Sequence, residues 1–148
     1  MKYIGLDLGS KTLGIAISDE LGFLARALET YRFNEDDYEA AANYIIDVAK
    51  ANKVTTLILG NPKHMNGDMG VRSQISVDFK NLIEGKSDLK VILEDERLTS
   101  VIVDKAMTFG DLSRKTRKQK KDEMAAVVIL QNYLDRKWLT WVKKEILY

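Results

Sequence analysis

The sequence predicts an α/β fold with a five-stranded mixed sheet in the order 3-2-1-4-5. Three strand-like segments come first, at residues 3–9, 12–19 and 24–32, and short polar turns separate them. Helix-like and strand-like segments then alternate, as they do where strands are parallel. If the first strand is central, short right-handed connections place the later strands on one side of it and the antiparallel meander on the other.

The later elements follow from periodicity and capping. Asn34 is the expected N-cap of a helix over 35–51, with Asp37 three residues on. An apolar strand over 54–60 leads into a loop that extends to Gly70. The next expected elements are a helix from Val71 to Ile83, a strand over 90–94, and a helix from 99 or 100 to 107.

The last part of the chain is predicted to contain a loop and two helices. Residues 110–121 lack apolar periodicity and are expected to form a polar loop. Asp122 then begins a helix that carries Ala125 and Ala126 on its apolar face. Residues 138–148 keep apolar residues and are expected to pack as a short separate helix.

Composition excludes several classes of site. With 148 residues and 45% hydrophobic content, the chain is expected to form one domain over 1–148, with about 136–148 as a C-terminal extension. No apolar stretch approaches the roughly 20 residues of a membrane span, so a cytoplasmic protein without membrane contact is expected. Zero Cys and one His exclude thiolate zinc sites and disfavour a serine-type triad.

Asp7 is the first candidate for chemistry because it is a carboxylate inside an apolar strand. Alternation puts Gly5 and Gly9 on the same face, which leaves room for a ligand beside Asp7. A carboxylate in such a place is tolerated when it is paired, hydrogen-bonded or bound to a cation. We therefore expect a ligand or metal site. The alternative is a strand-end Asp that accepts hydrogen bonds from the turn at 9–11.

Other acidic residues are expected at the same edge of the sheet. Ligands of open α/β sheets bind beyond the carboxyl ends of the strands, near the point where strand order reverses. The loop 60–70, the acidic run 94–97 and Asp122 all reach that edge with Asp7. Helix capping is the alternative role for Asp122. Within the acidic run, geometry does not choose among residues 94, 95 and 96.

Clustered carboxylates repel one another, and a divalent cation removes this conflict. Mg²⁺ or Mn²⁺ suits such oxygen ligands, and two ions about 4 Å apart stabilise both oxygens of a phosphoryl displacement. The predicted reaction is hydrolysis of phosphodiester bonds. A basic run before Asp122 is expected to contact the backbone of a nucleic acid, with a solvated loop as the alternative. The run comprises Arg114, Lys115, Arg117, Lys118, Lys120 and Lys121.

Four ordered blocks of sequence resemble the YqgF/RuvX family. They are GLDLGSKTLGIAISD (5–19), GNPKHMNGDMG (60–70), EDERLTS (94–100) and LSRKTRKQKKDEMAAVVILQNYLD (112–135). That family has an RNase H-like fold and is described as pre-16S rRNA nucleases or as Holliday junction resolvases. The family usually has Leu before the Pro of its glycine loop. This chain has Asn61 there, which is expected to alter the packing of the loop rather than its chemistry.

The resemblance implies metal-binding catalytic carboxylates at Asp7, Glu96 and Asp122. Alternation puts Glu94 on the same strand face as Glu96, so Glu94 is the fallback ligand. His64 is expected to be a loop residue rather than a general base. Further candidate phosphate contacts, each with an ordinary surface charge as the alternative, are Lys11, Arg72 and Arg97.

The resemblance also implies the function. Processing of the 5′ end of the 16S rRNA precursor, on structured RNA and by a monomer or weak homodimer, is the first expectation. Resolution of Holliday junctions in branched DNA is the second, and it would use a symmetric dimer. A non-catalytic nucleic-acid-binding module is a third. The block around Asp7 also resembles the phosphate loop of actin-like ATPases, although 148 residues provide no second lobe to close over a nucleotide.

Overall fold

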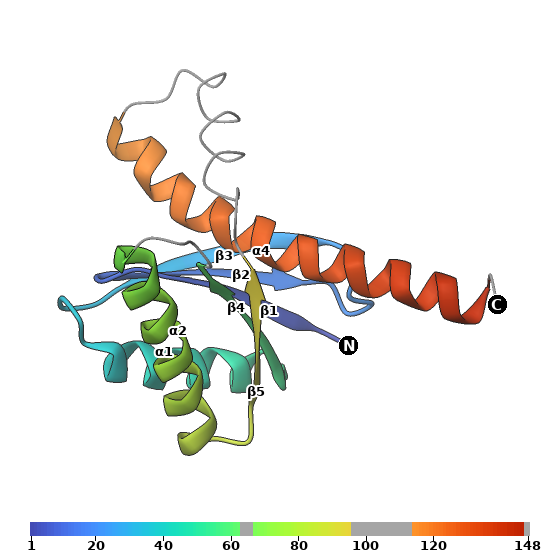
Figure 1. Cartoon of the computed structure of the whole chain (residues 1–148), viewed down its shortest axis with the longest axis horizontal. Helices are drawn as coiled ribbons and strands as arrows, with labels where there is room; N and C mark the ends of the chain where they lie inside the picture. The colour runs from blue at the N-terminus through green and yellow to red at the C-terminus, as the bar shows by residue number, and fades with distance from the viewer. Residues whose placement is uncertain (63–66, 96–113, 147–148) are drawn as a thin grey trace.

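A five-stranded sheet forms the centre of the protein. The structure, a computed structural model, describes residues 1–62, 67–95 and 114–146, without the side chains of 67–69 and 114–122. The strand order is β3-β2-β1-β4-β5, as predicted (Figure 1). Strands β1, β2 and β3 are antiparallel neighbours, whereas β4 runs parallel to β1 and β5 runs parallel to β4. The strands are β1 (Tyr3–Leu8), β2 (Thr12–Ser18), β3 (Ala25–Arg32), β4 (Thr56–Asn61) and β5 (Lys90–Asp95).

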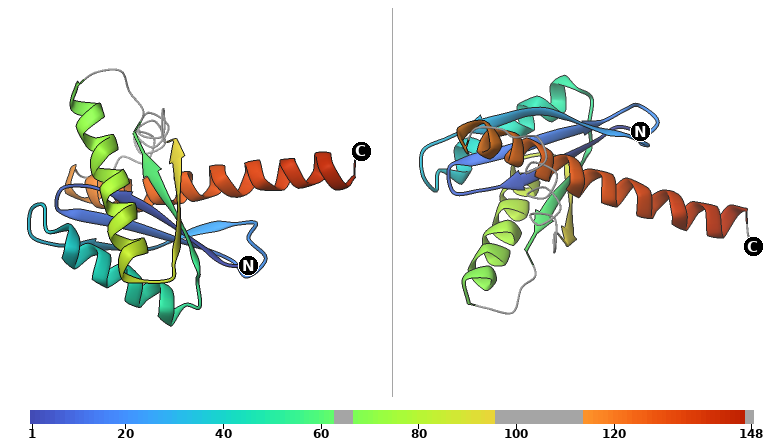
Figure 2. Two further views of the ribbon diagram at one scale, coloured as in Figure 1. Left: turned by 60° about the horizontal axis from the view of Figure 1, so that its bottom comes forward. Right: turned by 90° about the horizontal axis from the view of Figure 1, so that it is seen from above.

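Helices cover both faces of this sheet. Helices α1 (Tyr38–Ala51) and α2 (Gly67–Lys86) lie on one face, and the long helix α4 (Arg114–Glu145) crosses the other (Figures 1 and 2). Ile4 and Leu6 of β1 belong to the apolar cluster under α1 and α2, whereas Tyr3 belongs to the cluster under α4. Alternation therefore places Tyr3, Gly5 and Asp7 on the α4 face, as predicted.

Helix α4 packs very closely on β1. A Cβ atom added to Gly5 would lie 2.6 Å from Leu130 Cβ and 2.8 Å from the Ala126 carbonyl oxygen. Ala126, Ile129 and Leu130 are buried on this side of the sheet. Gly5 and Ala126 are thus small because two backbones approach each other here.

The structure corrects two predicted helix starts. Helix α1 begins after Asp37, whose carboxylate accepts a hydrogen bond from the Ala40 N–H, so Asn34 is not the N-cap. Asn34 instead accepts a hydrogen bond from the Asp37 N–H in a turn that places Asp36 at φ 61°. Helix α2 begins at Gly67 rather than near Val71. The cost of glycine within a helix, about 1 kcal/mol, is small enough for a well-packed helix to absorb.

The last helix also differs from the prediction. Helix α4 begins at Arg114, within the expected loop 110–121, and continues to Glu145 without a break before the expected tail helix. Lys, Arg and Gln are good helix formers, and neither Gly nor Pro interrupts the chain between Arg114 and Glu145. A basic stretch without apolar residues can therefore extend a helix that is packed further along.

One expected element lies outside the described residues. The helix predicted from 99 or 100 to 107 falls within residues 96–113, which the structure does not describe. None of the helices in the described ranges is both long and apolar enough to span a membrane.

Replacing Gly5 by Ala is expected to destabilise the protein by about 1–3 kcal/mol, because the new methyl group would overlap α4. The free energy of unfolding in urea measures this loss. Gly85→Ala in α2 is the control. A Cβ at Gly85 has nothing within 4 Å, so this change should stabilise the protein by up to about 1 kcal/mol. Equal stability of the two variants would contradict the close packing of α4.

Candidate functional site

Asp7 lies near the end of β1, on the sheet face that α4 covers, and is half-buried. Its partner across the antiparallel pair is Gly14 of β2, and Gly14 in turn pairs with Thr30 of β3. Residues directly opposite each other in neighbouring strands share a face. Asp7, Gly14 and Thr30 therefore form one row on the α4 face, with no side chain between the carboxylate and the threonine hydroxyl.

A second glycine lies on the other side of Asp7. Leu6 pairs with Leu59 of β4, so Gly60, the next residue, neighbours Asp7. Gly60 pairs with Glu94 of β5. Adjacent strands lie about 4.8 Å apart, which puts the backbones of Thr30 and Glu94 each roughly 10 Å from that of Asp7. The sheet surface on both sides of the Asp7 carboxylate is thus free of side chains from its own neighbouring strands.

Backbone hydrogen bonds fix the turn that follows Asp7. The Gly9 N–H donates to the Thr12 carbonyl at 2.8 Å. The Asp36 N–H donates to the Ser10 carbonyl at 2.8 Å, and the Phe33 N–H donates to the Lys11 carbonyl at 2.9 Å. The segment that precedes α1 therefore holds this turn against the sheet, and the exposed Lys11 is carried on it.

The end of β4 is tied to α2 by side chains. Asn61 is buried, and its side-chain oxygen accepts a hydrogen bond from the Ser73 hydroxyl at 3.0 Å. The Ser76 hydroxyl donates to the Gly60 carbonyl at 3.4 Å. Asn61 thus anchors the start of the 60–70 loop to the helix that follows it.

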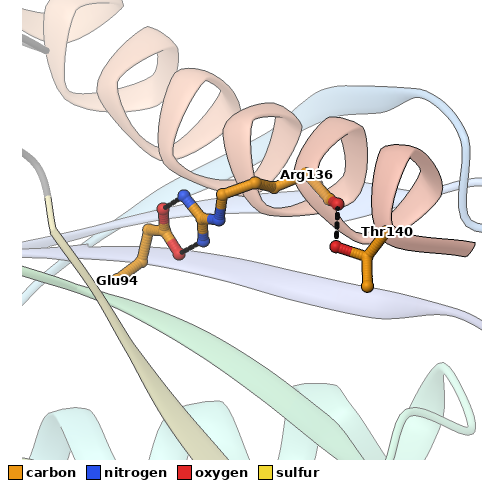
Figure 3. A network of polar contacts seen from close by, with 3 residues as sticks. All are labelled: Glu94, Arg136 and Thr140. Atoms are coloured by element: carbon orange, nitrogen blue, oxygen red, sulfur yellow. Dashed lines mark hydrogen bonds and ion pairs between the residues drawn. The ribbon is translucent and has the colours of Figure 1, made fainter. Parts of the chain in front are cut away.

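Glu94 forms a bidentate ion pair with Arg136 of α4 (Figure 3). The Glu94 side chain is only 4% exposed, whereas the Arg136 side chain is 60% exposed. The Thr140 hydroxyl donates to the Arg136 carbonyl one turn further along the helix. This pair supplies a counter-charge to a buried carboxylate and joins the edge strand β5 to α4.

The ion pair also shifts the acidity of its neighbours. The hydrogen bonds that the Arg136 guanidinium donates to the Glu94 carboxylate raise the pKa of Arg136 above its already high ordinary value, so Arg136 stays charged. Burial raises the pKa of the Tyr133 hydroxyl, and the nearby charge of Glu94 adds to the rise. Tyr133 therefore stays protonated at neutral pH and packs edge-on against Tyr3, with ring centroids 5.7 Å apart.

The other predicted site residues are placed as follows. Arg72 is exposed on α2, near Tyr38, and therefore lies with the helices on the opposite side of the sheet from α4. Glu96 and Arg97 lie outside the described residues. The helical backbone of α4 carries Asp122 and the basic run that precedes it, but the structure does not describe their side chains. Within the described part of the chain, no three acidic or histidine side chains are grouped as metal ligands.

Thr30 is a site residue that the sequence analysis did not identify. Its hydroxyl oxygen is buried and has no hydrogen-bond partner among the described residues, which is uncommon for a buried polar atom. It shares the row with Asp7 across Gly14. Thr30 lies within an ordinary β-rich segment, so only the strand register, which a single sequence does not contain, could have singled it out.

Known proteins match nearly the whole chain. The family model described as "RuvX: Holliday junction resolvase" matches residues 1–136. A protein of Geobacillus sp. (strain WCH70), named "Putative pre-16S rRNA nuclease", is 46% identical over 137 residues, which cover 93% of this chain and 99% of the relative. A protein of the same name from Staphylococcus aureus (strain JH9) is 42% identical over 135 residues, which cover 90% of this chain and 95% of the relative.

Two solved structures share the fold. RuvC of T. thermophilus in complex with a Holliday junction substrate has a TM-score of 0.63 at 13% identity, covering 93% of this chain and 96% of that chain. The Fowlpox virus resolvase in complex with substrate Holliday junction DNA has a TM-score of 0.54 at 15% identity, covering 93% of this chain and 99% of that chain. At these identities the likeness shows the fold alone, and it confirms the predicted RNase H-like fold.

Replacing Arg136 by Met is expected to destabilise the protein by about 2 kcal/mol, because it leaves the buried Glu94 carboxylate without its counter-charge. The value is below that of a fully buried pair because Arg136 is largely exposed. Urea unfolding measures it. Arg136→Lys keeps the charge without the bidentate geometry and should lose less.

The double variant Glu94→Gln/Arg136→Met should recover much of the lost stability, because no uncompensated charge remains. If Arg136→Met were as stable as the unaltered protein, the ion pair would not hold α4 on β5.

Proposed function

The chain belongs to the RuvX family, described as Holliday junction resolvases, and from this we propose that it is a metal-dependent nuclease of the cytoplasm that processes the 5′ end of the 16S rRNA precursor. The observation that carries the proposal is the row at the end of β1. It sets a half-buried carboxylate between glycines on an RNase H-like sheet.

We assign the metal-binding carboxylates to Asp7, Glu96 and Asp122. Such a set of oxygen donors suits Mg²⁺ or Mn²⁺. The glycines beside Asp7 support the fit, because they leave room for ions and a phosphate on the sheet surface. The ion pair of Glu94 with Arg136 supports Glu96 as the ligand from the acidic run, since Glu94 already has a partner.

The direction of α4 supports the assignment of Asp122. Tyr3 contacts Tyr133 and Lys137, whereas Gly5, two residues later, meets Ala126 and Leu130. The helix therefore runs antiparallel to β1. Between these two positions of β1 the contacted helix residues shift back by seven, from Tyr133 to Ala126 and from Lys137 to Leu130. The next step, from Gly5 to Asp7, leads from Ala126 back toward Asp122.

When bound, the metal ions would activate water and stabilise the charge that develops on the oxygens of the phosphodiester bond. The protein's own groups would hold the ions and position the substrate. Positive charges that would bind the nucleic-acid backbone are Lys11, Arg97, Arg114, Lys115, Arg117 and Lys118, whereas Arg72 lies with α1 on the other side of the sheet.

RNA is the preferred substrate because the two relatives named as pre-16S rRNA nucleases are more than 40% identical over nearly their whole length. The description of the family model supports a second candidate, the resolution of Holliday junctions. A third candidate is a module that binds nucleic acid without cleaving it. The presence of all three acidic residues in the sequence speaks against this third candidate.

Asp7→Asn is expected to abolish metal-dependent cleavage of a 16S precursor fragment, by at least about a hundredfold, because a metal ligand contributes several kcal/mol to the transition state. Cleavage with Mg²⁺ or Mn²⁺ is followed on gels, with a synthetic four-way junction as the second substrate. Asp47→Asn, on the exposed side of α1, is the matched control and should cleave normally.

Cleavage of the junction alone would replace the RNA proposal by the resolvase candidate. Binding of both substrates without cleavage of either would favour the non-catalytic module.

Thr30→Val is expected to leave kcat/KM nearly unchanged, because the Thr30 hydroxyl is buried and does not reach a phosphate. The same change should leave the free energy of unfolding unchanged or slightly raised, because the buried hydroxyl lacks a partner among the described residues. Steady-state kinetics and urea unfolding, measured on one preparation, test both expectations. A tenfold fall in kcat/KM would show that the hydroxyl does reach the substrate.

A further inference from the structure

Exposed apolar side chains gather at the end of the molecule opposite the candidate site. Of the ten large hydrophobic residues exposed in the described part of the chain, eight lie at the N-terminus, on the β2–β3 connection or in the last part of α4. We call these eight residues the tail patch. They are Met1, Leu21, Phe23, Leu24, Trp138, Leu139, Trp141 and Ile146. Exposed apolar patches of this kind mark interaction surfaces.

Trp138 lines two neighbouring hollows in the tail patch. The first has a volume of about 280 Å³ and lies between the β2–β3 connection and α4, with Met1, Phe23 and Trp141 among its lining residues. The second adjoins it and is lined by Phe23, Asp135 and Leu139, among others. The patch therefore presents both exposed aromatic side chains and hollows that could receive the side chains of a partner.

The last part of α4 projects beyond the sheet, and all three views show it extending away from the other elements (Figures 1 and 2). Leu134 is still buried, but residues 135–141 are all exposed. Helical spacing puts Trp138 and Trp141 on the face that meets the β2–β3 connection, and Leu139 and Ile146 on a different face. A helix end whose apolar residues are left largely exposed by its own fold is stabilised by a further partner.

The charges around the tail patch are of both signs and lie apart. The β2–β3 connection carries Asp19 and Glu20. Hydrogen bonds from the Leu24 and Phe23 N–H groups lower the pKa of the Asp19 carboxyl, which keeps it ionised. The end of α4 carries Lys143 and Lys144. A surface with a separate acidic turn and basic helix end is complementary in charge to a second copy of itself. It is less complementary to RNA or a lipid surface, which are uniformly anionic.

We propose that the tail patch joins two copies of this chain into a symmetric dimer, in which the end of α4 of each copy lies against the β2–β3 connection of the other. A two-fold axis uses the same surface on both copies, so the acidic turn of one meets the lysines of its partner twice. Trp138 and Trp141 are 46% and 53% exposed, so burying both removes about 150–250 Å² from water in total, part of the roughly 800 Å² per partner in a stable interface.

This inference is independent of the proposed nuclease activity. The family match ends at residue 136, before both tryptophans of the tail patch. Tyr3, which lines the first hollow, is at the opposite end of β1 from Asp7. A dimer formed through the tail patch would therefore leave the row around Asp7 accessible on both copies.

The first experiment measures the dissociation constant of the full-length chain by sedimentation equilibrium. Trp138→Ser/Trp141→Ser should weaken the dimer at least tenfold, with circular dichroism and thermal unfolding reporting that the fold is intact. Val71→Ser removes an equally exposed apolar residue on α2 and should leave the dimer unchanged. A chain that is monomeric over the whole micromolar range, or a dimer that the tryptophan changes do not weaken, would overturn the proposal.

The second experiment exchanges the charges. Chains with Lys143→Glu/Lys144→Glu, and chains with Glu20→Lys, should each dimerise poorly, because like charges then face each other. A mixture of the two should form the mixed dimer, in which both contacts again pair opposite charges. Native mass spectrometry distinguishes the three species. Failure of the mixture to dimerise, or loss of RNA or anionic-vesicle binding by tail-patch variants that remain monomeric, would assign the surface to another partner.

Discussion

The close approach of α4 to Gly5 is the contact on which the arrangement of the site depends. With a glycine on β1 and Ala126 on the helix, the two backbones come nearer than any larger side chain would allow. This contact sets the depth and direction of α4 over the sheet. The same helix brings Arg136 to Glu94 of β5 and, in the proposed site, would bring Asp122 toward the end of β1, so both depend on one small residue in the first strand.

Much of this arrangement could be predicted from the sequence, because apolar alternation and turn residues determine the strand order and the face on which Asp7 lies. The residues at which the helices begin and end could not be predicted from the sequence. Residues 114–121 form helix without an apolar stripe, since helix propensity and propagation from the packed part at Ala125 are sufficient. The N-cap moved from Asn34 to Asp37 because a turn hydrogen-bonded to Ser10 precedes the helix. Both depend on tertiary contacts.

The roles of the acidic residues of the site also depend on tertiary contacts that the sequence does not contain. Alternation places Glu94 and Glu96 on one strand face, and nothing in the sequence tells a structural carboxylate from a metal ligand. The partner of Glu94, Arg136, is 42 positions away along the chain, and only the fold brings the two together. Thr30 and Asp7 are likewise related only by strand register. Contacts between residues far apart in the sequence thus decide the role of a residue whose type alone allows several.

Helix α4 joins two regions with different physical character. Its 32 residues span about 48 Å, with the basic run and Asp122 near one end and the tail patch at the other. A dimer formed through the tail patch would hold its two active rows far apart, one on each side of the joined helix ends. Such a spacing suits two independent cuts in RNA, whereas a junction resolvase must bring both sites to opposed strands at one crossover. The projection of the helix, more than the chemistry of the row, would then select the substrate.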